Sequence, residues 1–192
     1  MSLRLKLREA TAPAHTAIES NPTLAGLLSA DLSEAAYVSI LKKYYGFFSP
    51  LEKNLAENEL AHTLVPDLEA RFKTSELHAD LLAFGLTDLD IAKLPVCRAL
   101  PSLSSGPEIL GTMYVTEGSA LGGLMISKHL STFPYYREDR GSFFHADPKG
   151  VSTRWKSYLA ALEGVAEADE PAVVGAALKA FAALDGWMRE RV

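Results

Sequence analysis

The sequence predicts an all-α protein with a single domain, and three observations support this. Apolar residues recur at helical spacing along most of the chain, alternating runs of the kind that form strands are absent, and no repeat or linker divides the chain. With 192 residues, 48% of them hydrophobic, the chain is long enough to bury one substantial core. We therefore expect residues 1–192 to form one multihelical bundle.

The first half of the chain predicts helices separated by proline and glycine. The first is expected from Leu3 to Ser20, with a kink at Pro13 or a restart capped by Thr11, because proline lacks a backbone donor. The other expected elements are a short helix over 23–29, a long helix from Glu34 capped by Asp31 or Ser33 and kinked at Pro50, a connector over 59–66, and short helices over 67–73, 75–84 and 87–93, with Gly85 ending the second of these.

The second half predicts three longer helices. A glycine-rich helix is expected from Glu108 to His129 or Leu130, between irregular segments over 95–107 and 131–149. Two helices over 151–166 and 171–191 close the chain.

Composition excludes several classes of function. The net charge of −5 and the absence of a basic tract argue against nucleic-acid binding. No uninterrupted apolar run approaches 18 residues, so we expect no membrane span. A single cysteine, Cys97, cannot form a disulfide within the chain, which favours the reducing cytoplasm.

The glycine-rich helix contains more glycine than a helix normally tolerates. Gly111, Gly118 and Gly122 fall on one face at 3.6 residues per turn. Each glycine inside a helix costs about 1 kcal/mol relative to alanine, so their presence needs a reason. That reason is the close approach of something to the backbone, either a flat ligand or a second helix.

A histidine and a carboxylate near the N-terminus form a second candidate feature. His15 and Glu19 are four residues apart and would meet on one helix face. Imidazole is a common metal ligand, and its other ring nitrogen often donates to a carboxylate. An ordinary surface pair is the alternative interpretation.

Taken together, these segments resemble the haem (heme) oxygenase family, in particular its bacterial, biliverdin-producing members. The run Leu7–Glu19 is similar to the proximal helix of the family, and Tyr114–Gly123 is similar to its distal helix. The pair Phe143–Phe144, followed by a helix that begins near Trp155, resembles a later family pattern. The order and spacing of these motifs fit across essentially the whole chain.

The resemblance implies that heme b is both cofactor and substrate. His15 would be the iron ligand and Glu19 would orient it. Gly118, Ser119 and Gly122 would form the catalytic distal surface. Other residues implied to contact heme, its propionates included, are Arg8, Tyr114, Phe144 and Lys156.

The activity implied by the resemblance is oxidative cleavage of heme to biliverdin, carbon monoxide and ferrous iron with dioxygen. The chain has no Gly-x-Gly-x-x-Gly fingerprint, so a separate ferredoxin or reductase is expected to supply electrons. The biliverdin could supply a bacteriophytochrome, or the reaction could serve iron acquisition; the sequence does not decide between them.

One departure keeps a second hypothesis open. Animal members of the family carry an aspartate that holds a distal water where this chain has Ser119. The water must then be anchored differently, and a non-catalytic heme-binding or storage protein is the alternative. A third hypothesis, a di-iron oxidase or a thiaminase-like hydrolase, lacks support because Glu59 and His62 have no matching second pair.

Overall fold

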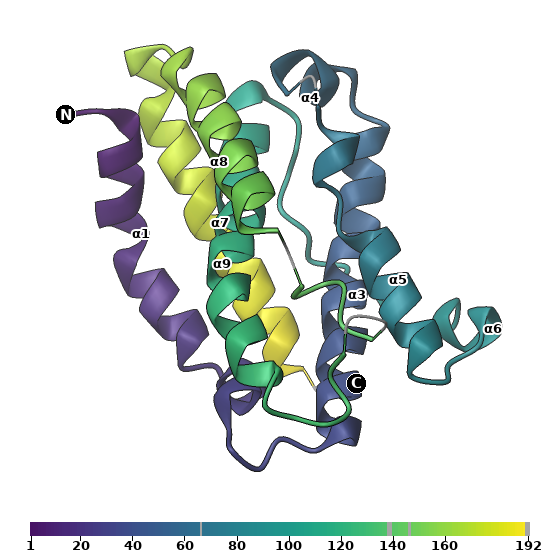
Figure 1. The fold of residues 1–192 in the computed structure, drawn as a ribbon. Helices are drawn as coiled ribbons and strands as arrows, with labels where there is room; N and C mark the ends of the chain where they lie inside the picture. Colours follow the sequence, from purple (N-terminus) through teal and green to yellow (C-terminus); the bar gives the residue numbers. More distant parts are fainter. Residues whose placement is uncertain (66, 138–139, 146, 191–192) are drawn as a thin grey trace.

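The computed structural model describes residues 1–65, 67–137, 140–145 and 147–190, and their regular structure is helical (Figure 1). The described residues form no strand; their β-structure is one isolated antiparallel bridge between Arg137 and Arg140. The predicted all-α class is therefore confirmed.

The described part of the chain contains nine α-helices and three short 3₁₀ turns, joined by irregular segments. The helices are α1 (Leu3–Glu19), α2 (Pro22–Ala25), α3 (Glu34–Ala56), α4 (Glu59–Leu64), α5 (Thr74–Ala83), α6 (Asp88–Ile91), α7 (Gly106–Leu130), α8 (Pro148–Glu163) and α9 (Glu170–Arg189), and the 3₁₀ turns are η1 (Gly26–Leu28), η2 (Glu69–Arg71) and η3 (Glu167–Asp169).

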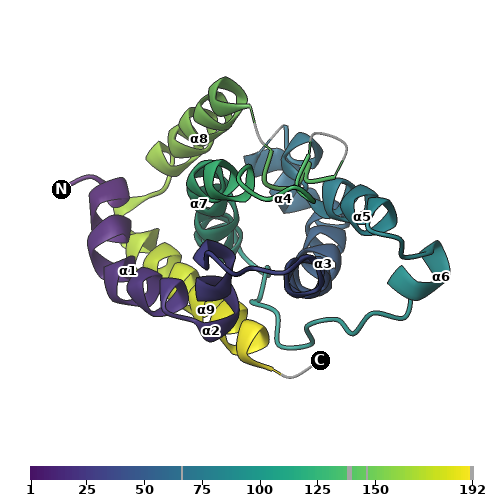
Figure 2. The same ribbon diagram turned by 60° about the horizontal axis from the view of Figure 1, so that its bottom comes forward.

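Helices α7 and α9 form the centre of the bundle. Figures 1 and 2 show α1 lying against α9, α8 beside α7, and α3 with α5 on the other side of α7. The residues between α1 and α3 connect the lower ends of the bundle in Figure 1, where η1 packs against α7. This arrangement places α1 and α7 on two sides of the surface that carries the candidate site.

The core is densest around the aromatic middle of α3. Tyr37, Phe47 and Phe48 are almost fully buried. Trp187 of α9 donates its indole N–H to the Lys43 carbonyl at 2.7 Å, so α3 and α9 are joined by a hydrogen bond as well as by packing. Gly46 is required there, because a Cβ would lie 2.5 Å from the Pro95 carbonyl oxygen.

Side-chain caps explain where several helices begin. Ser33 caps α3 and Ser105 caps α7, each by accepting from a backbone N–H in the first turn. Thr87 forms a capping box with Asp90 at the start of α6. Gly85 ends α5 with φ +92°, as expected for a left-handed stop.

One alternative predicted for the first helix is wrong. Helix α1 is continuous through Pro13, and buried Thr11 donates its hydroxyl to the Leu7 carbonyl at 2.7 Å instead of capping a restart. Kinks at Pro13 and at Pro50, which lies inside the continuous α3, stay predictions.

Two neighbouring predictions, the connector over 59–66 and the helix over 67–73, also differ from the structure. Part of the expected connector over 59–66 is helix α4, because Asn58 accepts from the Ala61 N–H and donates to the Leu103 carbonyl. The helix expected over 67–73 is only the turn η2. Residue 66 and the predicted helix end at 191 lie outside the described residues.

Helix α7 is long and apolar enough to pass a length-and-composition test for a membrane span, whereas none was expected from the sequence. Core helices of soluble proteins pass the same test. The packing of α7 against α9 accounts for its apolar character.

Candidate functional site

The imidazole of His15 lies in the C-terminal part of α1 and is largely exposed to solvent. Its Nδ1 lies 3.4 Å from Glu19 Oε1, and 59% of its side chain is exposed. Its ring lies edge-on to Phe181 of α9, with centroids 6.0 Å apart. Glu19 lies beside Nδ1, and no hydrogen bond of the described residues involves Nε2, so that nitrogen is available to a ligand.

The three glycines that share a face of α7 differ in what lies against them. A Cβ on Gly111 would lie 2.3 Å from the Val173 carbonyl oxygen and 2.6 Å from the Ala176 Cβ, so α9 packs directly on this backbone. A Cβ on Gly118 or on Gly122 would meet nothing within 4 Å. Helix packing therefore explains Gly111, and it does not explain the other two.

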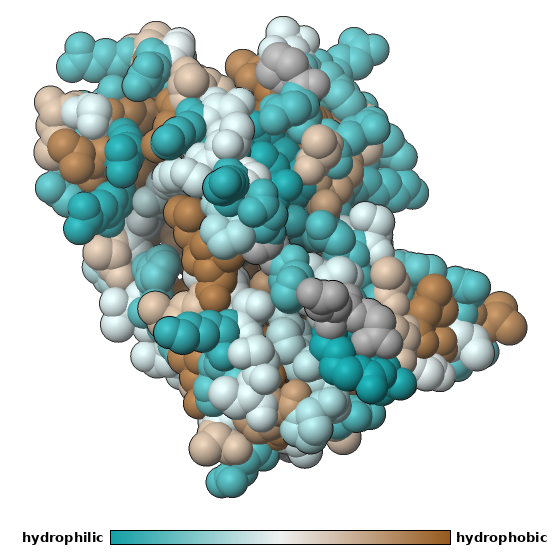
Figure 3. Space-filling view, viewed as in Figure 1, coloured by the Kyte–Doolittle hydropathy of each residue, from teal (hydrophilic) through white to brown (hydrophobic). Residues whose placement is uncertain are grey.

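The surface near Gly118 and Gly122 is hollow and apolar. Figure 3 shows the molecule hollowed between α1 and α7, with hydrophobic side chains along the edge of the hollow. On α7, Leu121 is 38% exposed and Met125 is 72% exposed. Exposed large apolar side chains beside two bare glycines are typical of a site for a flat apolar ligand.

A separate cavity of about 510 Å³ lies on the opposite face of α7. Its lining includes Leu124, Ser127 and Ser131, which are turned about half a helical circumference from Gly118 and Gly122. It is therefore distinct from the hollow beside α1.

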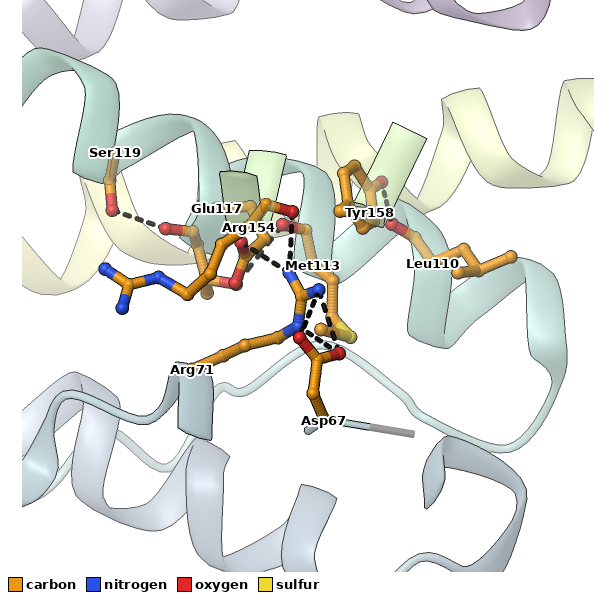
Figure 4. Close-up of polar contacts among 9 residues, drawn as sticks. Asp67, Arg71, Leu110, Met113, Glu117, Ser119, Arg154 and Tyr158 are labelled. Atoms are coloured by element: carbon orange, nitrogen blue, oxygen red, sulfur yellow. Dashed lines mark hydrogen bonds and ion pairs between the residues drawn. The ribbon is translucent and has the colours of Figure 1, made fainter. Parts of the chain in front are cut away.

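Glu117, directly before Gly118, is buried and its carboxylate lies against the Arg71 guanidinium in a polar cluster (Figure 4). Arg71 Nη1 donates to Glu117 Oε2 at 2.8 Å and to the Arg154 carbonyl at 3.1 Å, while its Nε and Nη2 donate to Asp67. One guanidinium thus joins the turn η2, α7 and α8 immediately beside the glycine face.

Burial dominates the electrostatics of this cluster. Desolvation raises the pKa of the Glu117 carboxyl, and the nearby Arg71 guanidinium opposes that rise. Burial also holds the pKa of the Tyr158 hydroxyl well above its usual value, and this hydroxyl donates to the Leu110 carbonyl at 2.7 Å. These groups fix α7 in place and are not exposed to a ligand.

Ser119 directly follows Gly118 on α7 and is exposed. Its hydroxyl donates to the Thr116 carbonyl at 2.7 Å, one turn back on α7 (Figure 4). The proton of the hydroxyl is therefore engaged, and its lone pairs remain available to accept from a water or a ligand.

The remaining predicted residues lie in different surroundings. Arg8 is exposed, and the continuity of α1 places it on the same face as His15, seven residues later. Lys156 is exposed on α8. Tyr114 is half-buried, with its ring 5.9 Å from that of Trp155.

Phe144 is only 3% exposed and packs among aromatic rings of the core. Its ring lies 4.6 Å from Phe143 and 5.7 Å from Tyr44, and it faces the Gly123 side of α7. These contacts are those of a core residue that supports α7 from behind.

Three of the other four histidines have local partners, His145 being the fourth. His62 Nε2 lies 2.9 Å from the Ala56 carbonyl, His78 Nε2 lies 3.1 Å from Asp88 Oδ1, and His129 Nε2 lies 3.1 Å from the Ser29 carbonyl. Within the described ranges, no three or more His, Cys, Asp or Glu side chains gather as a metal-binding group. The set of carboxylates and histidines that a di-iron centre would need is thus missing from that part of the chain.

Arg71 and Asp67 are functional-site neighbours that the sequence did not predict. The acidic and polar residues around them gave no sign of burial, and the partner Glu117 lies 46 positions further along the chain. Only the tertiary fold brings them together.

Comparison with known proteins identifies the family. Residues 1–190 match the family model described as Heme oxygenase, and this chain therefore belongs to that family. A relative, Heme oxygenase PigA of Pseudomonas aeruginosa, is 32% identical over 112 residues, which cover 58% of this chain and 54% of the relative. The matched part thus spans about half the length of that relative.

Solved structures of bacterial heme oxygenases share the fold. The enzyme from Neisseria meningitidis, with NO and CO bound, matches with a TM-score of 0.79 at 20% identity and covers 98% of this chain and 91% of that one. The Leptospira interrogans enzyme matches with a TM-score of 0.79 at 21% identity and covers 98% of this chain and 99% of that one. Heme oxygenase-1 from the cyanobacterium Synechocystis, in complex with heme, matches with a TM-score of 0.74 at 17% identity. The match covers 98% of this chain and 91% of that one.

Proposed function

We propose that this chain is a heme oxygenase that cleaves heme b to biliverdin, carbon monoxide and ferrous iron, using dioxygen and electrons from an external donor. The observation that carries this proposal, beside family membership, is the bare glycine face of α7. Gly118 and Gly122 have nothing within 4 Å of a Cβ, beside a hollow that also borders α1.

The donor set fits heme. His15 offers a free Nε2, and Glu19 at Nδ1 favours the tautomer that leaves Nε2 unprotonated. When bound, the heme supplies the iron that activates dioxygen and the porphyrin that is oxidised. The protein's part is to hold the ring between α1 and α7 and to keep the reacting edge accessible.

The distal residues would orient rather than react. Glycine at 118 and 122 lets the α7 backbone lie against the ring, and no side chain fills the volume that dioxygen needs. Ser119, with its proton directed at Thr116, can accept a hydrogen bond from a water beside that volume. We assign the proton-delivering water to this hydroxyl.

Cations on two helices would bind the propionates. Arg8 on α1 and Lys156 on α8 are both exposed, and α8 packs against α1 as well as α7. Tyr114 is the third residue we assign to this edge, through its hydroxyl. Phe144 acts from the core side by supporting α7 at Gly123.

We expect electrons to come from a ferredoxin or a reductase, because the chain carries no nucleotide-binding fingerprint. Biliverdin supply to a bacteriophytochrome and iron acquisition remain the two uses we consider. The single buried Cys97 is consistent with work in the reducing cytoplasm.

Turnover of the reconstituted complex tests the proposal. The purified chain is loaded with hemin and given ascorbate in air, with catalase present to remove free peroxide. We expect loss of the Soret band with formation of biliverdin and carbon monoxide. A lasting complex with intact heme after many reducing equivalents would identify the chain as a non-catalytic heme carrier.

A matched pair of variants assigns the roles. His15→Ala is expected to lose the ferric histidine-ligated spectrum and to regain it with added imidazole, whereas His62→Ala keeps the spectrum of the unaltered chain. Ser119→Ala is expected to bind heme normally and to form biliverdin more slowly, because the water acceptor is lost. Equal rates of biliverdin formation in Ser119→Ala and the unaltered chain would mean that another group binds the water.

A further inference from the structure

Helix α1 is tied to α9 by polar contacts at both of its ends. Near its start, Lys6 Nζ lies 2.5 Å from Glu170 Oε2. Just past its end, Asn21 Nδ2 donates to Asp185 Oδ1 at 2.8 Å and to the Asp185 carbonyl at 3.1 Å. Each half of α1 thus has its own attachment to the same helix.

Pro13 separates these two attachments. It has no N–H to donate to the Glu9 carbonyl, so the helix lacks one of its hydrogen bonds between positions 9 and 13. His15 lies on the C-terminal side of this weak point. The attachment at Asn21 is thus on the same side of Pro13 as His15, and the attachment at Lys6 is on the other side.

The Asn21 side chain is fully buried and fully used. Besides its two donated bonds to Asp185, its Oδ1 accepts from the Thr23 N–H at 3.0 Å. A buried amide with all of these bonds holds one geometry, because losing any of them leaves a polar group without a partner. The other carboxylate oxygen of Asp185 accepts from Arg189 Nε at 2.8 Å.

Successive turns of α9 face the two relevant positions of α1. Phe181 lies edge-on to the His15 imidazole, and Asp185, four residues later on the same face of α9, binds Asn21. We propose that the Asn21–Asp185 contact is a positioning element that fixes the C-terminal half of α1 and so sets the direction of the His15 imidazole. This rests on the proposed function only in taking His15 as the heme ligand.

Amide hydrogen exchange of the heme-free chain tests the anchor without any ligand. Asp185→Ala removes the side-chain acceptor of Asn21 and is expected to raise exchange of the amides of residues 14–20 by about tenfold, with little change over 3–12. Asp185→Asn keeps an acceptor oxygen, so its amides are expected to exchange at rates close to those of the unaltered chain. Arg189→Ala, which loses only the outer ion pair, is the matched control.

Lys6→Ala is the control for the opposite end, and it is expected to raise exchange only before Pro13. Equal exchange in Asp185→Ala and Asp185→Asn would overturn the anchor. So would a uniform rise along all of α1, because the helix would then respond as one unit.

The iron–histidine stretching band of the ferrous heme complex tests the effect on the ligand. We expect Asp185→Ala to shift or broaden this band and Lys6→Ala to leave it unchanged. An unchanged band in Asp185→Ala would overturn the positioning role. If His15→Ala kept the band, the proposed ligand would be wrong even where the exchange data supported the anchor, so the two failures are distinguishable.

Discussion

The two halves of α7 differ sharply although they form one unbroken helix. The first half, Gly106 to Glu117, is packed on several sides; its buried residues are Ile109, Leu110, Gly111, Thr112, Met113, Val115 and Glu117. In the second half, from Gly118 to Leu130, only Gly123 and Leu130 are buried. The same residue type therefore serves two purposes, helix packing at Gly111 and an open ligand face at Gly118 and Gly122.

The boundary between the halves lies at the Arg71–Glu117 ion pair. Glu117 is the last buried residue before the open face, and Arg71 fixes it to η2 and to the α8 backbone. A largely buried half thus supports a more exposed half, which is packed at fewer positions, among them Gly123 against Phe144. The predictions below test this division.

The largest effect is expected at Arg71. Arg71→Met leaves the Glu117 carboxylate buried without its cation, which should lower the free energy of unfolding by about 3–5 kcal/mol. Urea unfolding measures this. Arg189→Met, which removes an exposed ion pair, is the control and should change stability little. Equal losses in both variants would mean that the cluster does not secure α7.

Gly111→Ala is expected to have the next largest effect. Its Cβ would lie 2.3 Å from the Val173 carbonyl oxygen, so α7 and α9 must separate, at a cost of about 2–4 kcal/mol. Gly118→Ala, on the same helix, meets nothing and should stabilise the heme-free chain by up to about 1 kcal/mol. The melting temperatures of the two variants measure these effects. A shift of both temperatures in the same direction would contradict the difference between the two halves of α7.

Leucine at the open glycines tests ligand binding in place of stability. Gly118→Leu and Gly122→Leu should keep their helix content by circular dichroism, because the space is open, yet lose heme affinity by about tenfold or more. Gly186→Leu on α9, where a Cβ also meets nothing, is the matched control and should bind heme normally. Normal affinity in both α7 variants would remove the ligand explanation for the glycines.

A smaller effect is expected in the pH dependence of stability. Burial raises the pKa of Glu117 above 4.5, so the folded state binds this proton more readily than the unfolded chain does. Its contribution to stability is complete below pH 4.5 and declines as the pH rises toward the raised pKa. Glu117→Gln should remove that decline in urea titrations at several pH values.

Glu108→Gln is the control of opposite sign, because hydrogen bonds from Ser102 and Ser104 lower the Glu108 pKa. The stability that the Glu108 carboxylate contributes is present above pH 4.5 and is lost at lower pH. A Glu117→Gln variant whose stability follows the same pH curve as the unaltered chain would contradict the assigned burial effect.

The sequence predicted the helices well where local signals define them. Caps at Ser33 and Thr87, and the left-handed Gly85, act within a few residues of their own helix, so they can be recognised in the chain. Of the two alternatives predicted at Pro13, the restart is wrong, because packing of α1 on α9 offsets the missing hydrogen bond and keeps the helix continuous. Helix α4 was missed because its cap, Asn58, is also held by Leu103, which is distant in the sequence.

The candidate site was predictable only in part. The spacing of Gly111, Gly118 and Gly122 showed that they share a face, but what lies against each depends on where α9 ends its contact with α7. His15 and Glu19 were recognisable because they are neighbours on one helix. Arg71 was not, since its burial depends on Glu117 and on the Arg154 carbonyl, both far along the chain.

The most direct test of the central claim is paramagnetic broadening of backbone amide signals by bound heme. Spectra of the ferric heme complex are compared with those of the diamagnetic zinc protoporphyrin complex. We predict that the ferric complex loses the amide signals of Gly118 to Gly122 and of residues around His15, while those near Gly106, about 18 Å further along α7, persist. Persisting signals at Gly118 and Gly122 would contradict the account and place heme elsewhere.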